Sequence, residues 1–312
     1  MTNTRNIINL VLLVFIIIAA SIVRLDTGDE NKKSAITSLL QNDVLNITVR
    51  RAGKKDIYLE KNHTKWRIKR PYNAATNQFR MDTLLRLVQT IPQSTYPLKN
   101  IAQYGLAEPK LVVEFNNGLA NAVSIKFGDS DPIKMRRYVA VNDKLYLTND
   151  TYFYALNSIA TDYISNKLLP DDFKIIQLDL PELKLKIEND KWKVTPTQKD
   201  FSVDLVNELI SEWQNAQAMD IKPYELDTGI SPSQTIKIYG KDASTLTFYI
   251  LKDNEEFVFV NKLMGLKYSF PKEKQQQLLS WPKPPVSEEP IPETGTQPPD
   301  KTIPTEKNIP AK

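Results

Sequence analysis

The order of hydrophobic and polar positions is the same in two stretches of the chain. Residues 44–91 contain three short segments in which apolar and polar residues alternate, then one in which apolar residues recur every three or four positions. Residues 175–219 show the same succession of patterns. Alternation predicts β-strands with one buried face, whereas the longer spacing predicts an amphipathic helix. Both stretches are therefore predicted to fold as three strands followed by one helix.

The buried positions of these elements follow from the two periods. In the first stretch the strand positions that share a face are Ile47 and Val49, Ile57 and Leu59, and Trp66 and Ile68. In the second stretch they are Ile176, Leu178 and Leu180, Leu183, Leu185 and Ile187, and Trp192 and Val194. The helical stripes are Met81, Leu84, Leu85, Val88 and Ile91, ended by Pro92, and Val203, Val206, Leu209, Ile210 and Trp213, with Ser202 as the expected N-cap. These residues are predicted to form the core.

The correspondence continues beyond the two helices. Four more strands and a closing helix are predicted in each stretch, and nearly constant spacing relates Trp66 to Trp192, Gly105 to Gly229 and Tyr146 to Tyr268. The closing helices are expected to begin near Asp150 and at Pro271. The connections between strands are too short for parallel crossovers, so mostly antiparallel sheets are expected. The sequence predicts an α+β fold of two homologous modules, residues 40–168 and 169–281, each a mostly antiparallel sheet with amphipathic helices.

The N-terminal segment predicts a membrane helix. Residues 6–23 are uncharged and mostly apolar, and a helix of that length would cover about 27 Å, close to the hydrocarbon thickness of a bilayer. A cleaved signal peptide is the alternative, with Ala19–Ser21 as the cleavage site, but no polar stretch precedes these residues. We therefore expect residues 1–24 to be a signal anchor that contacts the lipid bilayer, and residues 25–39 to be a linker.

The charges that flank this helix do not decide its orientation by themselves. Arg5 lies before the helix, whereas Arg24, Lys32 and Lys33 follow it, so a strict count of basic residues opposes a cytoplasmic N-terminus. A short N-terminal tail ahead of a long domain nevertheless stays inside as a rule. We expect a single-pass protein of the inner (cytoplasmic) membrane with most of the chain extracytoplasmic.

The C-terminal segment is predicted to be a disordered tail. Residues 282–312 contain nine of the 20 prolines and few large apolar residues, so too little surface can be buried to offset the entropy of ordering. A ligand for a proline-binding partner, or a spacer, is the functional alternative.

Composition excludes several kinds of chemistry. The chain has no Cys and one His, so it has no disulfides, no thiol nucleophile, no thiolate zinc site and no multi-histidine metal site. Its nine glycines do not form the phosphate-binding motifs or the nucleophile elbow. A net charge of +4 from 41 basic and 37 acidic residues does not indicate nucleic acid. We expect no cofactor, no metal and no catalytic activity.

One segment combines acidic and basic side chains in a way that suggests a binding site. Asp129 and Asp131 lie in a loop, and Arg136 and Arg137 follow it. Arginine side chains of this kind bind carboxylate or phosphate, so the four residues are the best candidate for an anion or partner site. A cross-strand ion pair is the equally weighted alternative. The Asp-x-Asp pair also resembles calcium ligands, but the rest of the calcium loop is missing, and turn formation by the aspartates is the better interpretation.

The other candidate residues have simpler structural interpretations. His63 lies in a predicted hairpin turn without an orienting carboxylate, so an exposed loop residue is expected rather than a general base. Trp66 and Trp192 offer a sugar-stacking platform, although aromatic residues on alternating strands more often belong to the core. The basic turn formed by Arg50, Arg51, Lys54 and Lys55 is expected to be solvated.

Over roughly residues 7–281 the chain resembles a known bacterial family, and the resemblance is clearest in the string from Trp66 to Leu169. The segments that carry the resemblance are GLAEPKLVVEF, IKFGDSDP, RRYVAVNDKLYL and DYISNKLLP. The family has no known activity, and its members combine an N-terminal membrane helix with repeated β-rich modules. They are often encoded beside components of gliding-type ABC transporters. The resemblance implies a membrane-anchored protein associated with such a system, and it transfers no catalytic residue.

The sequence thus favours an accessory or scaffold protein of the cell envelope with a protein partner in the membrane or envelope, associated with an ABC-type transport system. A module that binds an envelope glycan or polymer through exposed tyrosine and tryptophan side chains is the alternative. A hydrolase that uses two carboxylates ranks third, because the separation of its acids is invisible in sequence.

Overall fold

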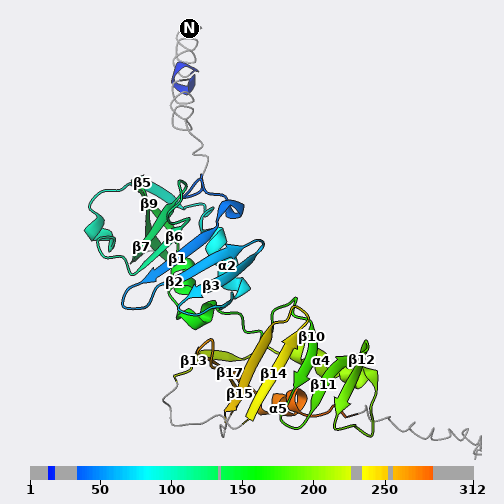
Figure 1. Cartoon of the computed structure of the whole chain (residues 1–312). Helices are drawn as coiled ribbons and strands as arrows, with labels where there is room; N and C mark the ends of the chain where they lie inside the picture. Colours follow the sequence, from blue (N-terminus) through cyan, green and yellow to red (C-terminus); the bar gives the residue numbers. More distant parts are fainter. Residues whose placement is uncertain (1–12, 18–33, 133–134, 226–233, 252–255, 284–312) are drawn as a thin grey trace, which may run out of the picture.

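Two antiparallel sheets follow one another along the chain (Figure 1). The computed structural model describes residues 13–17, 34–132, 135–225, 234–251 and 256–283. Residues 13–17 are helical with exposed side chains, and the rest of the predicted membrane helix lies outside the described residues, as does almost all of the predicted tail. Within the described ranges, no helix has both the length and the apolar character needed to cross a membrane.

The first sheet has nine strands in the order β4-β3-β2-β1-β6-β7-β8-β9-β5. Its strands are β1 (Asn46–Arg51), β2 (Ile57–Asn62), β3 (Lys65–Arg70), β4 (Ala74–Ala75), β5 (Ser94–Pro97), β6 (Leu111–Phe115), β7 (Val123–Asp131), β8 (Arg136–Val141) and β9 (Lys144–Asn149). The accompanying helices are α2 (Gln78–Leu87) and α3 (Thr151–Leu156), with 3-10 turns η1 (Gln41–Asp43), η2 (Ile101–Tyr104) and η3 (Ala160–Tyr163).

The second sheet has eight strands in the order β12-β11-β10-β14-β15-β16-β17-β13. Its strands are β10 (Ile175–Asp179), β11 (Lys184–Glu188), β12 (Lys191–Thr195), β13 (Asp220–Pro223), β14 (Gln234–Gly240), β15 (Thr245–Leu251), β16 (Phe257–Asn261) and β17 (Leu266–Phe270). Its helices are α4 (Val203–Gln214) and α5 (Lys272–Leu279).

The two sheets have the same order of strands when the short β4 is set aside. In each, a three-stranded meander lies beside a four-stranded meander, and the strand that follows the long helix lies at the far edge. Among the described residues, all the strand pairings are antiparallel, for example β1 with β6 and β10 with β14. The predicted antiparallel sheets with a few helices are confirmed, and they fit an α+β or a mostly β class. The homology of the two halves stays a prediction.

Each sheet buries one face beneath its helices. Successive side chains of β8 point to opposite faces of the sheet. Val139 and Val141 therefore belong to the large core cluster under α2 and α3, whereas Ala140 belongs to a small cluster on the opposite face. The predicted N-cap of α4 is present, since Ser202 Oγ accepts from Leu205 N. Asn77 caps α2 in the same way, through the amide of Arg80.

Four predicted core residues are exposed, each for a local reason. A register shift between β10 and β14 gives the buried position to Ile175, so Ile176 faces solvent. Ile187 lies at the end of β11, opposite Trp192 on the edge strand. Ile91 lies beyond the end of α2, which stops at Leu87, and Val203 is the first residue of α4.

Two edge strands were not expected from the sequence. β5 and β13 are four residues long, end in proline and show no apolar alternation. Each pairs along one side only, β5 with β9 and β13 with β17. Proline is tolerated at a sheet edge because its missing N–H is not needed there, so such strands carry no hydrophobic signature.

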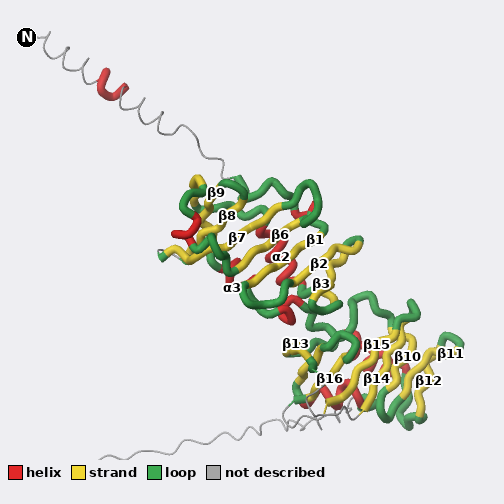
Figure 2. Tube along the Cα trace, turned by 60° about the vertical axis from the view of Figure 1, so that its left-hand side comes forward, coloured by secondary structure: helices red, strands yellow, loops and turns green. Residues whose placement is uncertain are grey.

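The chain joins the first sheet before the predicted module boundary. Ile36 and Leu39 lie in the predicted linker but are buried against the core. Ile36 N donates to Thr90 O (2.9 Å) and Thr37 Oγ1 donates to Val88 O (2.7 Å), both just after α2. This entry segment, dark blue in Figure 1, lies at the end of the first unit that faces away from the second sheet. Figure 2 shows the same arrangement from another side.

Candidate functional site

The four predicted site residues lie where β7 ends and β8 begins. Asp131 and Arg136 are direct partners across the two strands, and Arg136 Nε donates to Asp131 Oδ2 over 2.7 Å. The Asp131 carboxylate is buried, and the guanidinium of Arg136 is largely covered. The pair is therefore a charge-assisted, partly desolvated contact between neighbouring strands.

Arg137 points to the opposite face of β8, where its guanidinium contacts a carboxylate, a main-chain carbonyl and an aromatic ring. Its Nε donates to the carboxylate of Asp150, which precedes α3, and its Nη1 donates to Gly128 O over 2.5 Å. The guanidinium carbon also lies 3.6 Å from the centre of the Phe153 ring. Arg137 and Asp150 are both buried, so each charge depends on the other for compensation.

Asp129 is the one exposed member of the set. It lies in the bulge of β7, and its carboxylate is 3.6 Å from Lys110 Nζ, with both side chains more than half exposed. Gly105 has a positive φ of 67°, which favours glycine, and a Cβ there would lie 2.5 Å from Asp129 Cγ and would displace that carboxylate. The fold thus gathers the predicted residues at one end of the sheet, where both arginines bind carboxylates of the chain itself.

The remaining sequence candidates occupy structural positions. His63 lies in the β2–β3 turn with a positive φ of 54°, and its Nδ1 is 2.7 Å from Asn62 Oδ1. Trp66 and Trp192 are half-buried at equivalent strand positions and pack against the core. Arg51 corrects the prediction of a solvated basic turn, because its guanidinium is buried and binds the carbonyls of Lys55 and Ser158.

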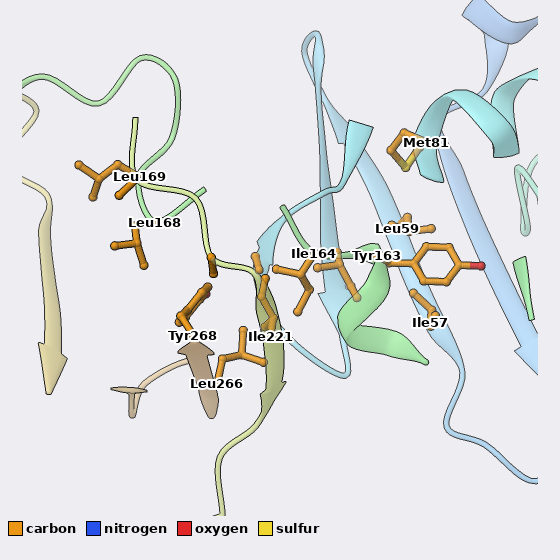
Figure 3. Close-up of a cluster of buried hydrophobic side chains, with 14 of the residues drawn as sticks. Ile57, Leu59, Met81, Tyr163, Ile164, Leu168, Leu169, Ile221, Leu266 and Tyr268 are labelled. Atoms are coloured by element: carbon orange, nitrogen blue, oxygen red, sulfur yellow. The ribbon is translucent and has the colours of Figure 1, made fainter. Parts of the chain in front are cut away.

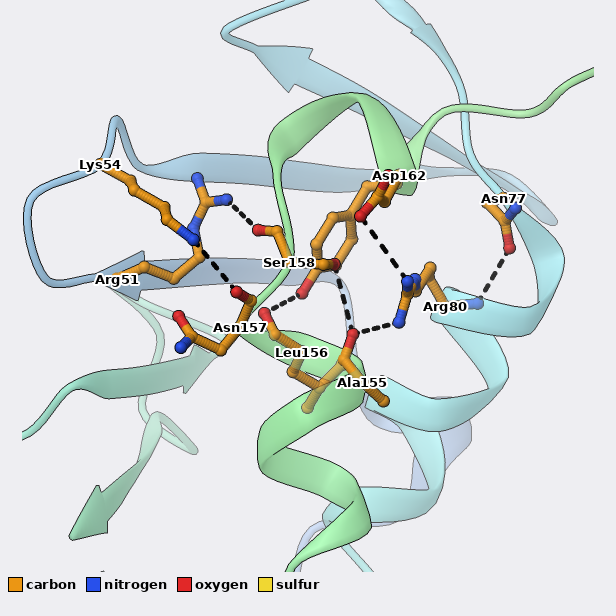
Figure 4. Close-up of polar contacts among 10 residues, drawn as sticks. Arg51, Lys54, Asn77, Arg80, Ala155, Leu156, Asn157, Ser158 and Asp162 are labelled. Carbon is orange, nitrogen blue, oxygen red and sulfur yellow. Dashed lines mark hydrogen bonds and ion pairs between the residues drawn. The ribbon is translucent and has the colours of Figure 1, made fainter. Parts of the chain in front are cut away.

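A cluster that the sequence did not predict surrounds the C-terminal end of α3. Four consecutive carbonyls accept side-chain donors: Ala155 from Arg80, Leu156 from Tyr163 Oη (2.6 Å), Asn157 from Lys54 Nζ (3.2 Å) and Ser158 from Arg51 (Figure 4). Cations and hydroxyls satisfy helix-end carbonyls and the negative end of the helix dipole. Burial raises the pKa of Tyr163 and lowers the pKa of Arg51. The donors come from three separate segments, namely the end of β1 with the β1–β2 turn, α2 and η3, so no local motif could reveal the cluster.

A groove opens between α2 and α3 on the helical side of the first sheet. Its volume is about 600 Å³, and its large apolar or aromatic lining residues are Phe79, Ile91 and Tyr152. Its remaining lining is polar or small: Gln41, Thr83, Arg86, Gln89, Thr90, Gln93, Asn149, Thr151 and Ala155. The signal in the sequence is Phe79, an aromatic residue outside the apolar stripe of α2.

The segment that connects the two sheets is bound first to the first sheet. Asn77 N donates to Tyr163 O over 2.8 Å, and Ser165 N donates to Ala75 O over 2.9 Å. Ile164 thereby forms an antiparallel bridge with Thr76. The connecting segment therefore extends the first sheet as a short strand-like pairing.

The next residues of the same segment are bound to the second unit. Ala218 N donates to Asn166 O over 2.8 Å, and Leu168 N donates to Ala216 O over 3.1 Å. Ser165 is thus held by one unit, while its neighbour Asn166 is held by the other. No free linker separates the two sheets.

Apolar side chains cover this backbone pairing on both sides. Figure 3 shows Tyr163 directed toward Ile57, Leu59 and Met81 of the first unit, while Ile164, Leu168 and Leu169 accompany Ile221, Leu266 and Tyr268 of the second. Full burial of one large apolar side chain contributes about 1.5–3 kcal/mol. Burial also raises the pKa of Tyr268 to about 12. The junction is therefore a continuous core rather than a contact between two surfaces.

Comparison with known proteins identifies one domain. Residues 66–205 match the family model described as a domain of unknown function (DUF4340). The match begins in β3 and ends in the first turn of α4, so it runs through the junction. No curated protein and no solved structure matches the chain. In the described part of the chain, no group of three or more His, Asp or Glu side chains is arranged to hold a metal ion.

Proposed function

We propose that this protein is a non-catalytic accessory or scaffold protein of the cell envelope. Residues 6–23 anchor it in the inner membrane as a single-pass helix, and the two sheets lie on the extracytoplasmic side. It holds a protein partner of an ABC-type transport system. The observation that carries the proposal is the junction, which joins two β-sheet units without a free linker.

A rigid junction suits a protein that sets a distance or an orientation. Domains joined by flexible linkers move independently, whereas a buried apolar junction fixes their relative placement. The entry segment and the second sheet lie at opposite ends of the described body. An anchor at the entry end would hold the second sheet at a defined height above the bilayer.

The buried charges favour a structural role for the predicted site. Arg137 and Asp150 bind each other, and Arg51 binds main-chain carbonyls. Groups used in this way stabilise the fold and are not poised to react. The matched domain runs from β3 to the first turn of α4 and includes the junction, which supports the view that the junction is part of what such proteins share.

The same proposal includes an origin by duplication. The common strand order of the two sheets supports it, as do the paired residues Trp66 and Trp192 on β3 and β12. Two copies of one fold, rigidly joined, present similar surfaces at two heights above the membrane.

Topology is tested by cysteine labelling, because the native chain has no Cys to give background. Leu263 is 96% exposed in the β16–β17 turn, so Leu263→Cys offers an accessible thiol. In cells with a permeabilised outer layer, a membrane-impermeant maleimide should label Leu263→Cys, and should label Asn3→Cys only after lysis. The reverse pattern would refute the proposed orientation.

Partnership is tested by purification of the tagged full chain from solubilised membranes. Transporter components should be recovered in a fixed ratio, and the control is a chain in which residues 6–23 are replaced by an unrelated membrane helix. Equal recovery from the control would locate the contact in the two sheets. Recovery of no transporter or envelope protein would contradict the scaffold proposal.

A further inference from the structure

We propose that the groove between α2 and α3 is a binding site for an oligosaccharide segment of an envelope polymer. The groove belongs to the first unit alone and is separate from the predicted arginine site. Its volume of about 600 Å³ lies within the ~300–1,000 Å³ range of small-ligand sites.

The aromatic wall is the first reason for this assignment. Phe79 lies in the first turn of α2 and is 63% exposed, and half-buried Tyr152 faces the groove from α3. An exposed aromatic ring loses the stabilisation that its burial would give. The C–H face of a pyranose ring provides a flat apolar surface that can cover such a ring and leave the sugar hydroxyls free at its rim.

The polar lining is the second reason. Four carboxamide side chains line the groove: Gln41, Gln89, Gln93 and Asn149. A carboxamide both donates and accepts hydrogen bonds, which matches sugar hydroxyls and acetamido groups, since these also do both. Thr83, Thr90 and Thr151 also line the groove, and the hydroxyls of Thr83 and Thr90 donate to the carbonyls of Phe79 and Arg86. The apolar side chains of a peptide could not pair with the carboxamides of Gln41, Gln89 and Gln93, so the lining favours a ligand rich in hydroxyl groups, such as a sugar.

The charges of the lining residues indicate which sugars the groove would bind. No Asp or Glu lines the groove in the described part of the chain, and Arg86 provides a single positive charge. A guanidinium binds carboxylates through paired hydrogen bonds. The site therefore suits a neutral chain or one that carries uronic-acid or similar carboxylate groups, and it disfavours cationic polymers.

The walls of the groove are held in place before any ligand binds. Arg80 of α2 donates to the carbonyl of Ala155 of α3, and its other nitrogen lies 3.8 Å from Asp162 (Figure 4). Ala155 itself lines the groove. Thr90, another lining residue, accepts a hydrogen bond from Ile36 of the entry segment. A preformed site loses less entropy on binding.

The position of the groove also suits an envelope polymer. The contact with Ile36 places the groove beside the point where the chain enters the first unit. This step rests on the proposed anchoring, which would bring the groove close to the membrane surface. The binding itself is independent of the anchor and of any transporter, so its test is separate from the test of the scaffold role.

The experiment is isothermal titration calorimetry on the full chain in lipid nanodiscs. The probes are a hexamer of N-acetylglucosamine, which is neutral, and a hexamer of galacturonic acid, which is acidic. Phe79→Ala should weaken the binding of both probes about tenfold or more, because it removes the aromatic surface. Arg86→Gln should weaken the acidic probe about tenfold and leave the neutral probe within about twofold.

The matched control is Tyr154→Ala. Tyr154 lies on α3, is 67% exposed and does not line the groove, so its substitution removes a similar ring from the same layer. Its affinity for both probes should stay within about twofold of the native chain. Equal thermal midpoints of the Phe79 and Tyr154 variants will show that both are folded. Absence of saturation by either probe at millimolar concentration, or equal losses in the two variants, would overturn the proposal.

Discussion

The Arg137–Asp150 pair allows a quantitative test of the fold around the predicted site. Asp150→Asn preserves the shape of the side chain but removes its charge. The carboxylate is buried beside Arg137, whose guanidinium also binds Gly128 O and lies over the Phe153 ring. The substitution leaves a buried cation without its counter-charge, and breaking a buried pair in this way costs about 3–5 kcal/mol.

The same region provides a matched control. Asp129→Asn makes the same chemical change on a carboxylate that is 54% exposed and lies 3.6 Å from an exposed Lys110. An exposed pair of this kind contributes about 0–1 kcal/mol. The double variant Arg137→Met, Asp150→Asn removes both charges, so it should recover a large part of the loss.

The assay is urea unfolding of the full chain in detergent, followed by far-ultraviolet circular dichroism. Asp150→Asn should lower the unfolding midpoint clearly, Asp129→Asn should leave it almost unchanged, and the double variant should lie between them. A loss of less than 1 kcal/mol for Asp150→Asn, or equal losses for the two single variants, would refute the view that burial makes this pair structural.

Two further predictions concern the junction. Tyr268 keeps its proton in the folded chain up to about pH 12, whereas the unfolded chain loses it near the ordinary pKa of about 10, so this contribution to stability is full below pH 10. This contribution should fall by about 3 kcal/mol as the pH rises from 10 to 12. The difference between the urea midpoints measured at pH 9.5 and at pH 11.5 should therefore be smaller for Tyr268→Phe than for the native chain. Ala218→Pro removes the N–H that donates to Asn166 O, so small-angle scattering should report a broader distribution of distances between the two units with little change in circular dichroism. Unchanged scattering would mean that the apolar cluster alone fixes the junction.

The strand pattern was readable from the sequence wherever one face of a strand is buried. Ile47 and Val49, or Leu183 and Leu185, alternate because a helix covers one side of the sheet. The edge strands β5 and β13 were missed because each pairs along one side only and ends in proline. Alternation reports burial of a face, so a strand that is largely exposed leaves no trace in the pattern.

The partners of the candidate site could not be derived from local sequence. Arg136 and Arg137 are neighbours, and alternation sends them to opposite faces of β8. Arg136 pairs with Asp131 across the β7–β8 hairpin, as the position of Arg136 just after the acidic loop suggested. Arg137 instead binds the carboxylate of Asp150, which lies after β9 and just before α3. That contact depends on how α3 packs on the sheet, and residue spacing carries no information about it.

The two long helices differ at the second residue after the cap. Phe79 lies two residues after the Asn77 cap of α2, and Asp204 lies two residues after the Ser202 cap of α4. An acidic residue in the first turn stabilises a helix by about 0.3–1 kcal/mol through the helix dipole, so Asp204 is accounted for by the helix itself. Phe79 gives up that stabilisation and leaves its ring 63% exposed. The guanidinium of Arg80 lies 5.9 Å from the centre of the ring and stabilises it in part. A sugar that covers the exposed ring would add the stabilisation that burial provides, and the proposed groove is the surface on which the ring lies.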